Sequence, residues 1–370
     1  MPFRIIRNDI AKVSADVIVN TADPHPVVGR GTDSAVYKAA GKKALLAERR
    51  KIGNIAPGQA AATPAFALSA KYIIHTVGPV WNGGDHCERD ILRSCYKKSL
   101  DLACELNAES IAFPLIAAGN NRFPKDEALN IALEEIGRFL LLHDMEIILV
   151  VFDENSFMLS KNLTEKIEEY IDEHSVGIAS RSEYENIRET RRSLKETLFN
   201  SIQRTASAAG KSVLNKIPSA EAERICADAL TCEEDAAPAA VSLMNVEGKS
   251  LDEVLENTGE TFRQRLFRLI DESGMDDVTV YKKANIDRKV FSRIRCKEDY
   301  IPKKRTAVAF AIALRLDMPT MLDLLSRAEI AFSPSSKFDL IITYFVTNGI
   351  YDIFEINAAL FKYGQPILGE

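Results

Sequence analysis

The sequence predicts a three-layer α/β domain, followed by a linker and an all-α domain. Two observations carry this prediction. Short apolar runs alternate with helical patterns through residues 1–176, which is typical of a sheet lying between helices. From residue 249 to 370 the pattern is helical throughout. A length of 370 residues also favours two domains over one.

Six apolar runs of the first region read as strands, and several are apolar without interruption, as strands covered on both faces are. They are FRIIRND, ADVIVNTA, QAAATPA, KYIIHTVGP, SIAFPLIAA and EIILVVFD. Helical patterns separate them, at Asp33–Ala40, Ile91–Leu106, Asp126–Leu142 and Leu163–Glu173.

The remainder of the chain divides at about residue 249. Residues 177–248 are highly charged or rich in small residues, so we expect a linker in which one amphipathic helix can form. Helix starts are signalled beyond it by capping residues at the expected spacing. These are Ser250 with Glu253, Asp317 before Pro319, and Ser336 with Asp339.

The composition excludes several classes of protein. A net charge of −6 and a pI near 5.6 argue against a protein that is coated with nucleic acid along its length. The six cysteines form no CxxC pair and have no histidine at zinc-finger spacing, which predicts reduced thiols with no metal site and no cofactor. No segment reads as a signal core or a membrane span, so we expect a cytoplasmic protein without membrane contact.

Two glycine-bearing loops join a strand to a helix and are candidates for anion binding. In the first, Gly29 and Gly31 let backbone amides approach a phosphate just before a helix start. In the second, FPLIAAGNNRFP, Gly119 follows a strand and is expected to be the hinge of the loop. Two such loops at the same strand ends can hold a diphosphate between them, although glycine turns also connect many strands to helices without binding anything.

The order of these segments resembles the macrodomain family, which processes Appr-1''-p and binds ADP-ribose, through about the first 175 residues. The segments are ND-I, VIVNTAD, the glycine loop, AAG, IIHTVGPVWNGG and SIAFPLIAAG. The stretch His75–Gly84 looks most like the branch of O-acetyl-ADP-ribose deacetylases and mono-ADP-ribosyl hydrolases. The resemblance implies a mixed central sheet between helices and a ligand that lies across the strand ends.

The resemblance also implies roles for single residues. Asp9 accepts a hydrogen bond from the adenine amino group, Ile10 packs near the base, and Phe123 packs on the distal ribose. Asn20 and Asp23 are the first and last residues of the motif that holds this ribose. The two phosphate loops are Gly29, Arg30, Gly31 and Thr32, and Ala118, Gly119, Asn120 and Asn121.

Several positions depart from the family pattern. Asp23 replaces an asparagine, Val28 and Arg30 replace glycines, and Ala118 and Asn121 replace a small hydroxyl residue and a tyrosine. Arg30 either pairs with phosphate or is a solvated surface residue. Asp33 matches the family residue that positions or activates water, and Asp23 beside it completes the candidate catalytic pair. The residues expected to bind the ligand are mostly kept, whereas residues expected to take part in catalysis are changed.

Each candidate also has a structural interpretation. Asp9 and Asp33 both stand at helix starts and are good capping residues. His75 lies in an apolar strand, which favours a hydrogen-bonded core histidine over a catalytic base. Trp81, the only tryptophan, is expected to pack in a lid or in the core.

The segment VYKKANIDRKVFSRI resembles the helix-turn-helix of phage-repressor-like domains, over about residues 262–328. Asn285 takes the turn, Ile286 the buried position and Asp287 the helix cap. Tyr281 departs from the small residue that is usual there. Outward-facing candidates for DNA contact are Arg288, Lys289, Ser292, Arg293 and Arg295. A helical protein-contact module explains the same pattern equally well.

These observations favour a reader or sensor that binds ADP-ribose or an ADP-ribosylated protein and relays occupancy through the helical domain. The first alternative is an ADP-ribosyl hydrolase or O-acetyl-ADP-ribose deacetylase. The second is a DNA-binding regulator.

Overall fold

The computed structural model describes residues 2–152, 159, 163–171, 259–297 and 300–369. Contacts join Met1–Ile171 and Gly259–Glu370 in one compact unit. The predicted linker and the predicted capping box of Ser250 and Glu253 fall outside the described residues.

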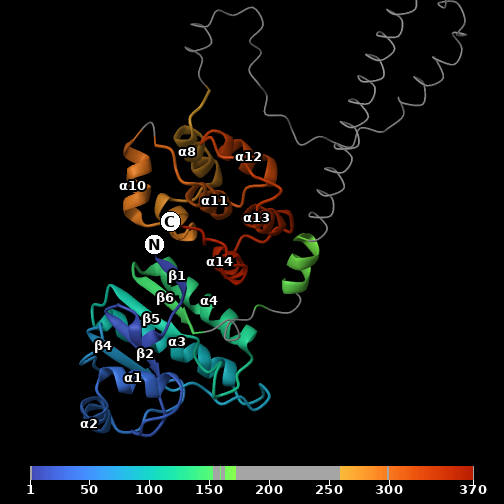
Figure 1. Ribbon diagram of the computed structural model, residues 1–370. Helices are drawn as coiled ribbons and strands as arrows, with labels where there is room; N and C mark the ends of the chain where they lie inside the picture. Colours follow the sequence, from blue (N-terminus) through green and yellow to red (C-terminus); the bar gives the residue numbers. More distant parts are fainter. Residues whose placement is uncertain (1, 153–158, 160–162, 172–258, 298–299, 370) are drawn as a thin grey trace, which may run out of the picture. The chain divides into compact units, whose positions relative to one another are not determined.

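A six-stranded mixed sheet forms the middle layer of the N-terminal region (Figure 1). Its order is β1-β6-β5-β2-β4-β3, and every neighbouring pair is parallel except β3 with β4. All six predicted strands are present. They are β1 (Phe3–Arg7), β2 (Val17–Thr21), β3 (Ala60–Pro64), β4 (Tyr72–Thr76), β5 (Ser110–Pro114) and β6 (Glu146–Val151).

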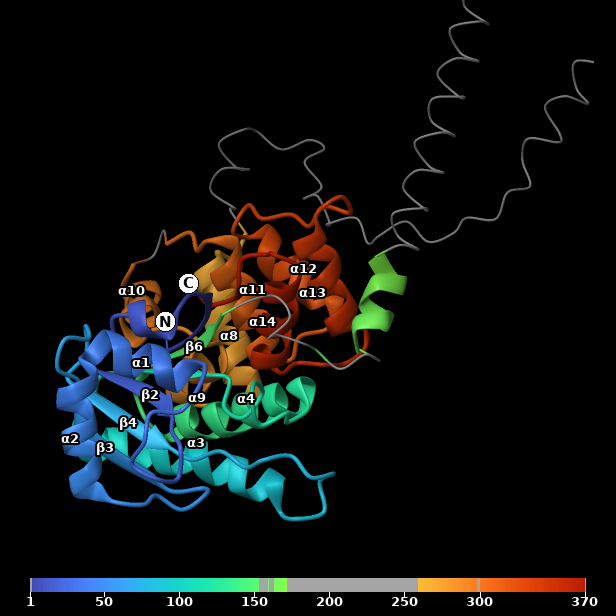
Figure 2. The same cartoon turned by 60° about the horizontal axis from the view of Figure 1, so that its bottom comes forward.

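Helices cover both faces of this sheet, as Figure 2 shows. They are η1 (Ile10–Lys12), α1 (Thr32–Ala40), α2 (Lys42–Ile52), α3 (Glu88–Glu105) and α4 (Lys125–Leu142). The sequence patterns singled out α1, α3 and α4 but not α2. A left-handed Gly41, with φ of 101°, separates α2 from α1 and lets the chain turn between two helices.

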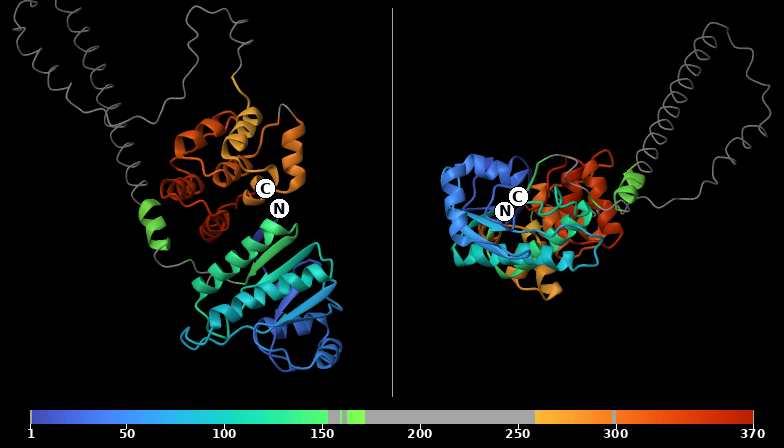
Figure 3. Two further views of the ribbon diagram at one scale, coloured as in Figure 1. Left: turned by 180° about the vertical axis from the view of Figure 1, so that it is seen from behind. Right: turned by 90° about the horizontal axis from the view of Figure 1, so that it is seen from below.

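Alternate residues of the central strands point to opposite layers. Ile18 of β2 joins an apolar cluster with Val36 and Leu45 of α1 and α2. Its neighbours Val17 and Val19 join the cluster that contains the buried residues of α3 and α4. A strand buried on both faces must be apolar without interruption, which is why the run VIV was recognisable in the sequence. Figure 3 shows the sheet and its helices from behind and from below.

The C-terminal region is helical, as predicted. Its helices are α8 (Phe262–Ser273), α9 (Asp277–Lys283), α10 (Arg288–Cys296), α11 (Lys304–Ala313), α12 (Met318–Ser326), α13 (Lys337–Thr347) and α14 (Ile353–Lys362). Asp317 caps α12 by accepting from Thr320 N, with Pro319 in the first turn. Ser336 caps α13 by accepting from Asp339 N.

The capping-box spacing also predicts that the Asp339 side chain accepts a hydrogen bond from the Ser336 backbone, and this prediction is wrong. The Asp339 carboxylate is buried and accepts from Lys304 Nζ at 2.7 Å and from Ser333 N at 2.8 Å. A charged partner stabilises a buried carboxylate more than a neutral backbone amide does. A full capping box occurs instead at α8, between Thr261 and Gln264.

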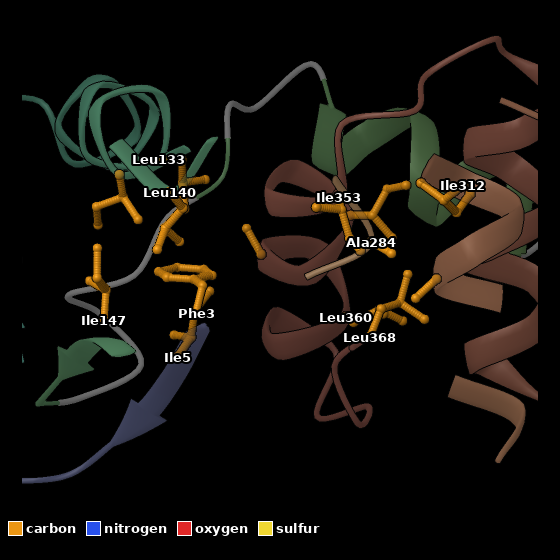
Figure 4. Close-up of a cluster of buried hydrophobic side chains, with 14 of the residues drawn as sticks. Phe3, Ile5, Leu133, Leu140, Ile147, Ala284, Ile312, Ile353, Leu360 and Leu368 are labelled. Carbon is orange, nitrogen blue, oxygen red and sulfur yellow. The ribbon is translucent and has the colours of Figure 1, made fainter. Parts of the chain in front are cut away.

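Buried side chains join the helical region to the sheet (Figure 4). β1 is an edge strand, and the Asn285 side chain satisfies both outward backbone groups of Phe3, with N–Oδ1 at 2.9 Å and Nδ2–O at 3.1 Å. The Phe3 ring packs edge-on against Phe354 of α14 at 5.3 Å. Phe354 in turn lies against Gly137 of α4, where a side-chain carbon would stand 3.1 Å from its ring.

Within the described part of the chain, no helix is long and apolar enough to cross a membrane. The same residues contain no group of three or more side chains arranged to hold a metal ion. Cys87, Cys95, Cys104 and Cys296 are free thiols.

Candidate functional site

A cavity of about 640 Å³ lies at the carboxyl ends of the parallel strands β2 and β5. β2 runs into the loop that precedes α1, and β5 runs into the loop that precedes α4. Ligands of open α/β sheets bind at this edge of the sheet. The predicted residues that line the cavity are Asp23, Gly29, Arg30, Gly31, Thr32, Asp33, Gly119, Asn120 and Asn121.

The first loop depends on its two glycines for different reasons. Gly31 has φ of 62° and ψ of −126°, a conformation that residues with a side chain rarely adopt. A side-chain carbon on Gly29 would lie 3.0 Å from Asp33 Oδ2. The loop therefore brings bare backbone to the start of α1, and a carbon on Gly31 would lie 3.2 Å from Asn120 Nδ2 of the second loop.

Asp33 is buried beneath the first loop and has only 1% of its surface exposed. One carboxylate oxygen accepts from Asn20 Nδ2 at 2.6 Å, and the other accepts a very short hydrogen bond from the Gly29 amide. Burial raises the pKa of Asp33, the two hydrogen bonds lower it, and the nearby charge of Asp23 raises it further.

A second row of buried polar groups stands behind Asp33. Asn20 Nδ2 also lies 3.1 Å from Nδ1 of His75, and His75 Nε2 lies 3.0 Å from Thr63 Oγ1. His75 is fully buried, as expected for a core histidine, and burial together with the charge of Arg49 lowers its pKa to about 3. The imidazole is therefore neutral at physiological pH.

Arg49 is a functional candidate that sequence reasoning missed. It is 1% exposed, and its guanidinium donates to the carbonyls of Gly53, Asp23 and Pro24. Burial lowers its pKa, while the nearby negative groups, including Asp33 and Asp23, raise it. In the sequence, the run ERRK on α2 looks like a solvated face, and only the fold shows that one of these cations is buried.

The second loop is shaped differently from the prediction. Gly119 has neither a left-handed φ nor any heavy atom near the position of a side-chain carbon. The left-handed residues are Ala117, with φ of 63°, and Arg122, with φ of 56°. The expectation that Gly119 is the hinge is therefore wrong, because non-glycine residues on either side of it make the turn.

Asn121 fixes the second loop to the segment after β4. Its Nδ2 donates to the carbonyls of Gly78 and Pro79, at 3.1 and 2.9 Å, and its own carbonyl accepts from Trp81 N. Trp81 packs edge-on against Phe123 at 4.8 Å. Trp81 is thus a packing residue, as expected, and Asn121 has a structural role besides lining the cavity.

The remaining predicted ligand residues lie around the cavity and not in its wall. Asp9 caps η1 by accepting from Ala11 N at 3.0 Å, and Ile10 is buried in the cluster that α1 covers. Val28, which does line the cavity, packs against the same cluster. Ala118 and Phe123 are 8% and 2% exposed and belong to the other core cluster.

The residues proposed for DNA contact lie on α10. Asp287 caps this helix, and Arg288, Lys289, Ser292 and Arg293 are exposed. Arg288 and Lys289 border a cavity of about 420 Å³ that Glu109, Asp144 and Glu146 also line. Arg295 pairs with Asp277 and lies over the ring of Phe267. Asn285 takes the predicted turn with φ of 53°, and Ile286 and Tyr281 are buried.

The fold and the site together define a three-layer α/β domain with a ligand cavity where two loops meet above parallel strand ends. Comparison with known proteins identifies the family. The family model "Macro domain" matches residues 19–132. A macro domain-containing protein of Methanosarcina mazei is 41% identical over 166 residues, which cover 44% of this chain and 88% of that protein. The chain belongs to the macrodomain family.

Two further relatives have more specific names. The O-acetyl-ADP-ribose deacetylase of Klebsiella pneumoniae is 42% identical over 165 residues, covering 43% of this chain and 94% of the enzyme. Among solved structures, the Oceanobacillus iheyensis macrodomain with ADP is 34% identical over 42% of this chain and 85% of that one, with a TM-score of 0.40. The Trypanosoma brucei macrodomain in complex with ADP-ribose is 31% identical over 42% and 66%, with a TM-score of 0.39.

Proposed function

We propose that the N-terminal region, residues 1–176, binds ADP-ribose or an ADP-ribosylated protein, and that the chain acts as a reader or sensor. The observation that carries the proposal is the meeting of the two loops. Gly31 and Asn120 approach each other above the ends of β2 and β5, beside the backbone amides at the start of α1. A diphosphate fits such a place because amides and the helix dipole favour negative charge.

Charge in and behind the cavity supports an anionic ligand. Arg30 is exposed on the first loop and lines the cavity, where its guanidinium can pair with a phosphate. Arg49 adds a buried positive charge behind Asp23. A buried charge acts strongly at short range because the protein screens it less than water does.

The state of Asp33 favours a reader over a hydrolase. Each of its oxygens already accepts a hydrogen bond, and 1% of its surface is exposed. A general base must reach the water whose proton it takes. The alternative, an ADP-ribosyl hydrolase or O-acetyl-ADP-ribose deacetylase with Asp33 and Asp23 as catalytic pair, is supported by the name of the Klebsiella pneumoniae relative.

Titration calorimetry with ADP-ribose tests the binding proposal on the full chain. We expect wild-type protein to bind, and Asp9→Ala to weaken binding by about 1–3 kcal/mol, the scale for losing a hydrogen bond to a charged group. Asp9→Asn is the matched variant, because asparagine is an equally good cap and preserves the bond from Ala11 N. No binding by wild type would refute the proposal. If Asp9→Ala and Asp9→Asn both bind as tightly as wild type, only the role of Asp9 is refuted.

A second candidate function, DNA binding by a repressor-like segment at residues 262–328, has one specific observation in its favour. α10 exposes Arg288, Lys289, Ser292 and Arg293 on one side of a capped helix, with Phe291 and Ile294 buried on the other. The acidic residues that share the cavity with Arg288 and Lys289 oppose it, because they would repel phosphates. A protein-contact module remains the alternative for this region.

A further inference from the structure

We infer that Thr63, His75 and Asn20 are positioning residues for Asp33, forming a buried chain of hydrogen bonds with a fixed direction. Through it they hold the Asp33 carboxylate against the Gly29 amide and so shape the first phosphate loop. The chain itself is a property of the fold. Its effect on a ligand rests on the proposed ADP-ribose function.

The direction of the chain follows from the chemistry of its members. A carboxylate is acceptor-only, so Asn20 must present its NH₂ group to Asp33 Oδ1 at 2.6 Å. The same Nδ2 lies 3.1 Å from His75 Nδ1, so that ring nitrogen must be an unprotonated acceptor. The proton of the neutral imidazole is therefore on Nε2 and is donated to Thr63 Oγ1 at 3.0 Å.

One oxygen remains unpaired in this orientation, and the alternative orientation is less favourable still. Asn20 Oδ1 is buried and has no hydrogen-bond partner among the described residues. Leaving a buried acceptor unpaired has a cost in free energy. The alternative amide orientation would place Oδ1 2.6 Å from an oxygen of the Asp33 carboxylate, so that two acceptors would face each other.

The environment keeps the imidazole in the state that the chain requires. Asn20, Thr63 and His75 are all buried, and the Tyr37 ring lies 6.3 Å from the His75 ring. The charged groups near the chain are Asp33 itself, Asp23 and Arg49. A protonated His75 would place a donor against the Asn20 amide and would face the buried cation Arg49, so it is excluded from this arrangement at neutral pH.

The elements that carry these residues fix the spacing of the hydrogen-bonded chain. Asn20 is on β2, whereas Thr63 and His75 are on the paired strands β3 and β4, so the sheet fixes their spacing. Asp33 is on α1, and its second oxygen holds the Gly29 amide. Losing the Thr63 acceptor would leave His75 Nε2–H unsatisfied and favour the other tautomer, whose Nδ1–H would turn the Asn20 amide away from Asp33.

Thr63→Val tests the inference because valine keeps the shape of threonine and removes the hydroxyl. Thr76→Val is the matched control. Thr76 is also buried, on β4, and it donates to the Gln59 carbonyl, which is not part of the series of hydrogen bonds that leads to Asp33. We expect Thr63→Val to weaken ADP-ribose binding by the full-length protein about tenfold, and Thr76→Val to change it less than twofold. His75→Gln, which offers both an acceptor and a donor, should lose less affinity than His75→Leu.

A spectroscopic measurement keeps the inference separate from the proposed function. With ¹⁵N-labelled histidine and glycine in the full chain, the wild-type His75 should show a protonated Nε2 and a bare Nδ1. The hydrogen-bonded Gly29 amide resonance should shift in Thr63→Val and not in Thr76→Val. A His75 protonated on Nδ1, or an unmoved Gly29 resonance, overturns the inference. Failure of wild type to bind ADP-ribose while these resonances behave as expected refutes only the ligand.

Discussion

The Asp33 carboxylate and the Gly29 amide are joined by a hydrogen bond that ties the start of α1 to the loop before it. The other oxygen of Asp33 is held by Asn20 at 2.6 Å. Asp33 therefore organises backbone groups that face the cavity, a role that neither helix capping nor water activation describes.

Asp33→Asn should weaken ADP-ribose binding by about 1–2 kcal/mol, roughly tenfold. The new side chain is nearly isosteric, but its amide can offer an oxygen to only one of the two donors, Gly29 N and Asn20 Nδ2. Calorimetry on the full chain measures the effect. The control is Asp16→Asn, because Asp16 accepts from Glu109 N on a separate part of the domain. Equal affinity of wild type and Asp33→Asn would contradict this role.

Wild-type protein should hydrolyse ADP-ribosyl esters slowly or not at all, even though it binds them. Both oxygens of Asp33 already accept hydrogen bonds and 1% of its surface is exposed, so the carboxylate has little access to a water. Asp23→Asn, which removes a negative charge beside the phosphate loop and supplies an amide donor for the ribose, should increase turnover of O-acetyl-ADP-ribose several-fold, measured by product chromatography. Rapid wild-type turnover that disappears in Asp33→Ala would instead establish the hydrolase.

His75 should make the protein lose stability in mild acid. Its folded pKa of about 3 lies below the ordinary value of 6.5, so the unfolded state binds the extra proton between these values. Stability from this group is present above pH 6.5 and falls as the pH drops toward 3, by about 1.4 kcal/mol per pH unit. Asp33 has the opposite sign, because its raised pKa favours the folded state as the pH falls.

Urea unfolding at several pH values between 4 and 7 measures this dependence. His75→Gln is the matched variant, since glutamine does not titrate. Its free energy of unfolding should depend less steeply on pH than that of wild type. The difference in slope should be about 1.4 kcal/mol per pH unit, which corresponds to one proton. Parallel curves for the two proteins would show that His75 is not held neutral in the folded state.

Asn285→Gly should lower the unfolding free energy by about 1–3 kcal/mol, because the backbone groups of Phe3 lose buried partners. Asn285→Ala should cost about 1 kcal/mol more, since alanine is strained at φ of 53° and glycine is not. Asn348→Ala, which removes only a local bond to Tyr344 O, is the control. Equal stability of all three variants in urea would contradict the anchoring role of Asn285.

If α10 binds duplex DNA, the triple variant Arg288→Ala, Lys289→Ala and Arg293→Ala should reduce the slope of log affinity against log salt by about 2–3. Replacing the exposed Lys97 and Lys98 of α3 by alanine should leave the slope unchanged. Mobility shifts on genomic fragments at two salt concentrations, with and without ADP-ribose, make the measurement. Absence of a shift at low salt rules out this function. A shift that ADP-ribose changes would support coupling between the two regions.

Much of the fold could be predicted because its signals are local. The run VIV of β2, the glycines of the first loop and the caps Asp287 and Asp317 are each readable within a few residues. What escaped prediction depends on pairs that are distant in the chain. The charge of Arg49 becomes significant only once α2 packs it behind Asp23.

The candidate site was predicted in the same uneven way. Asp33, Gly29 and Gly31 follow from the motif, but the turn of the second loop is made by Ala117 and Arg122, whose left-handed conformations no local rule favours. The pairing of Asn285 with Phe3 spans 282 residues. The sequence indicated Asn285 as a turn residue and contained no sign of its partner.

The covered edge of the sheet has a practical consequence for any fragment of this protein. An unpaired edge strand is a template for the strands of other molecules, and proteins protect such edges. Here Asn285 and α14 protect β1, and Phe354 of α14 also packs against Gly137 of α4. Cutting away residues 259–370 would expose Phe3 and its neighbours, so the isolated N-terminal region should be prone to aggregate. We therefore expect the helical region to protect the macrodomain from edge-to-edge association.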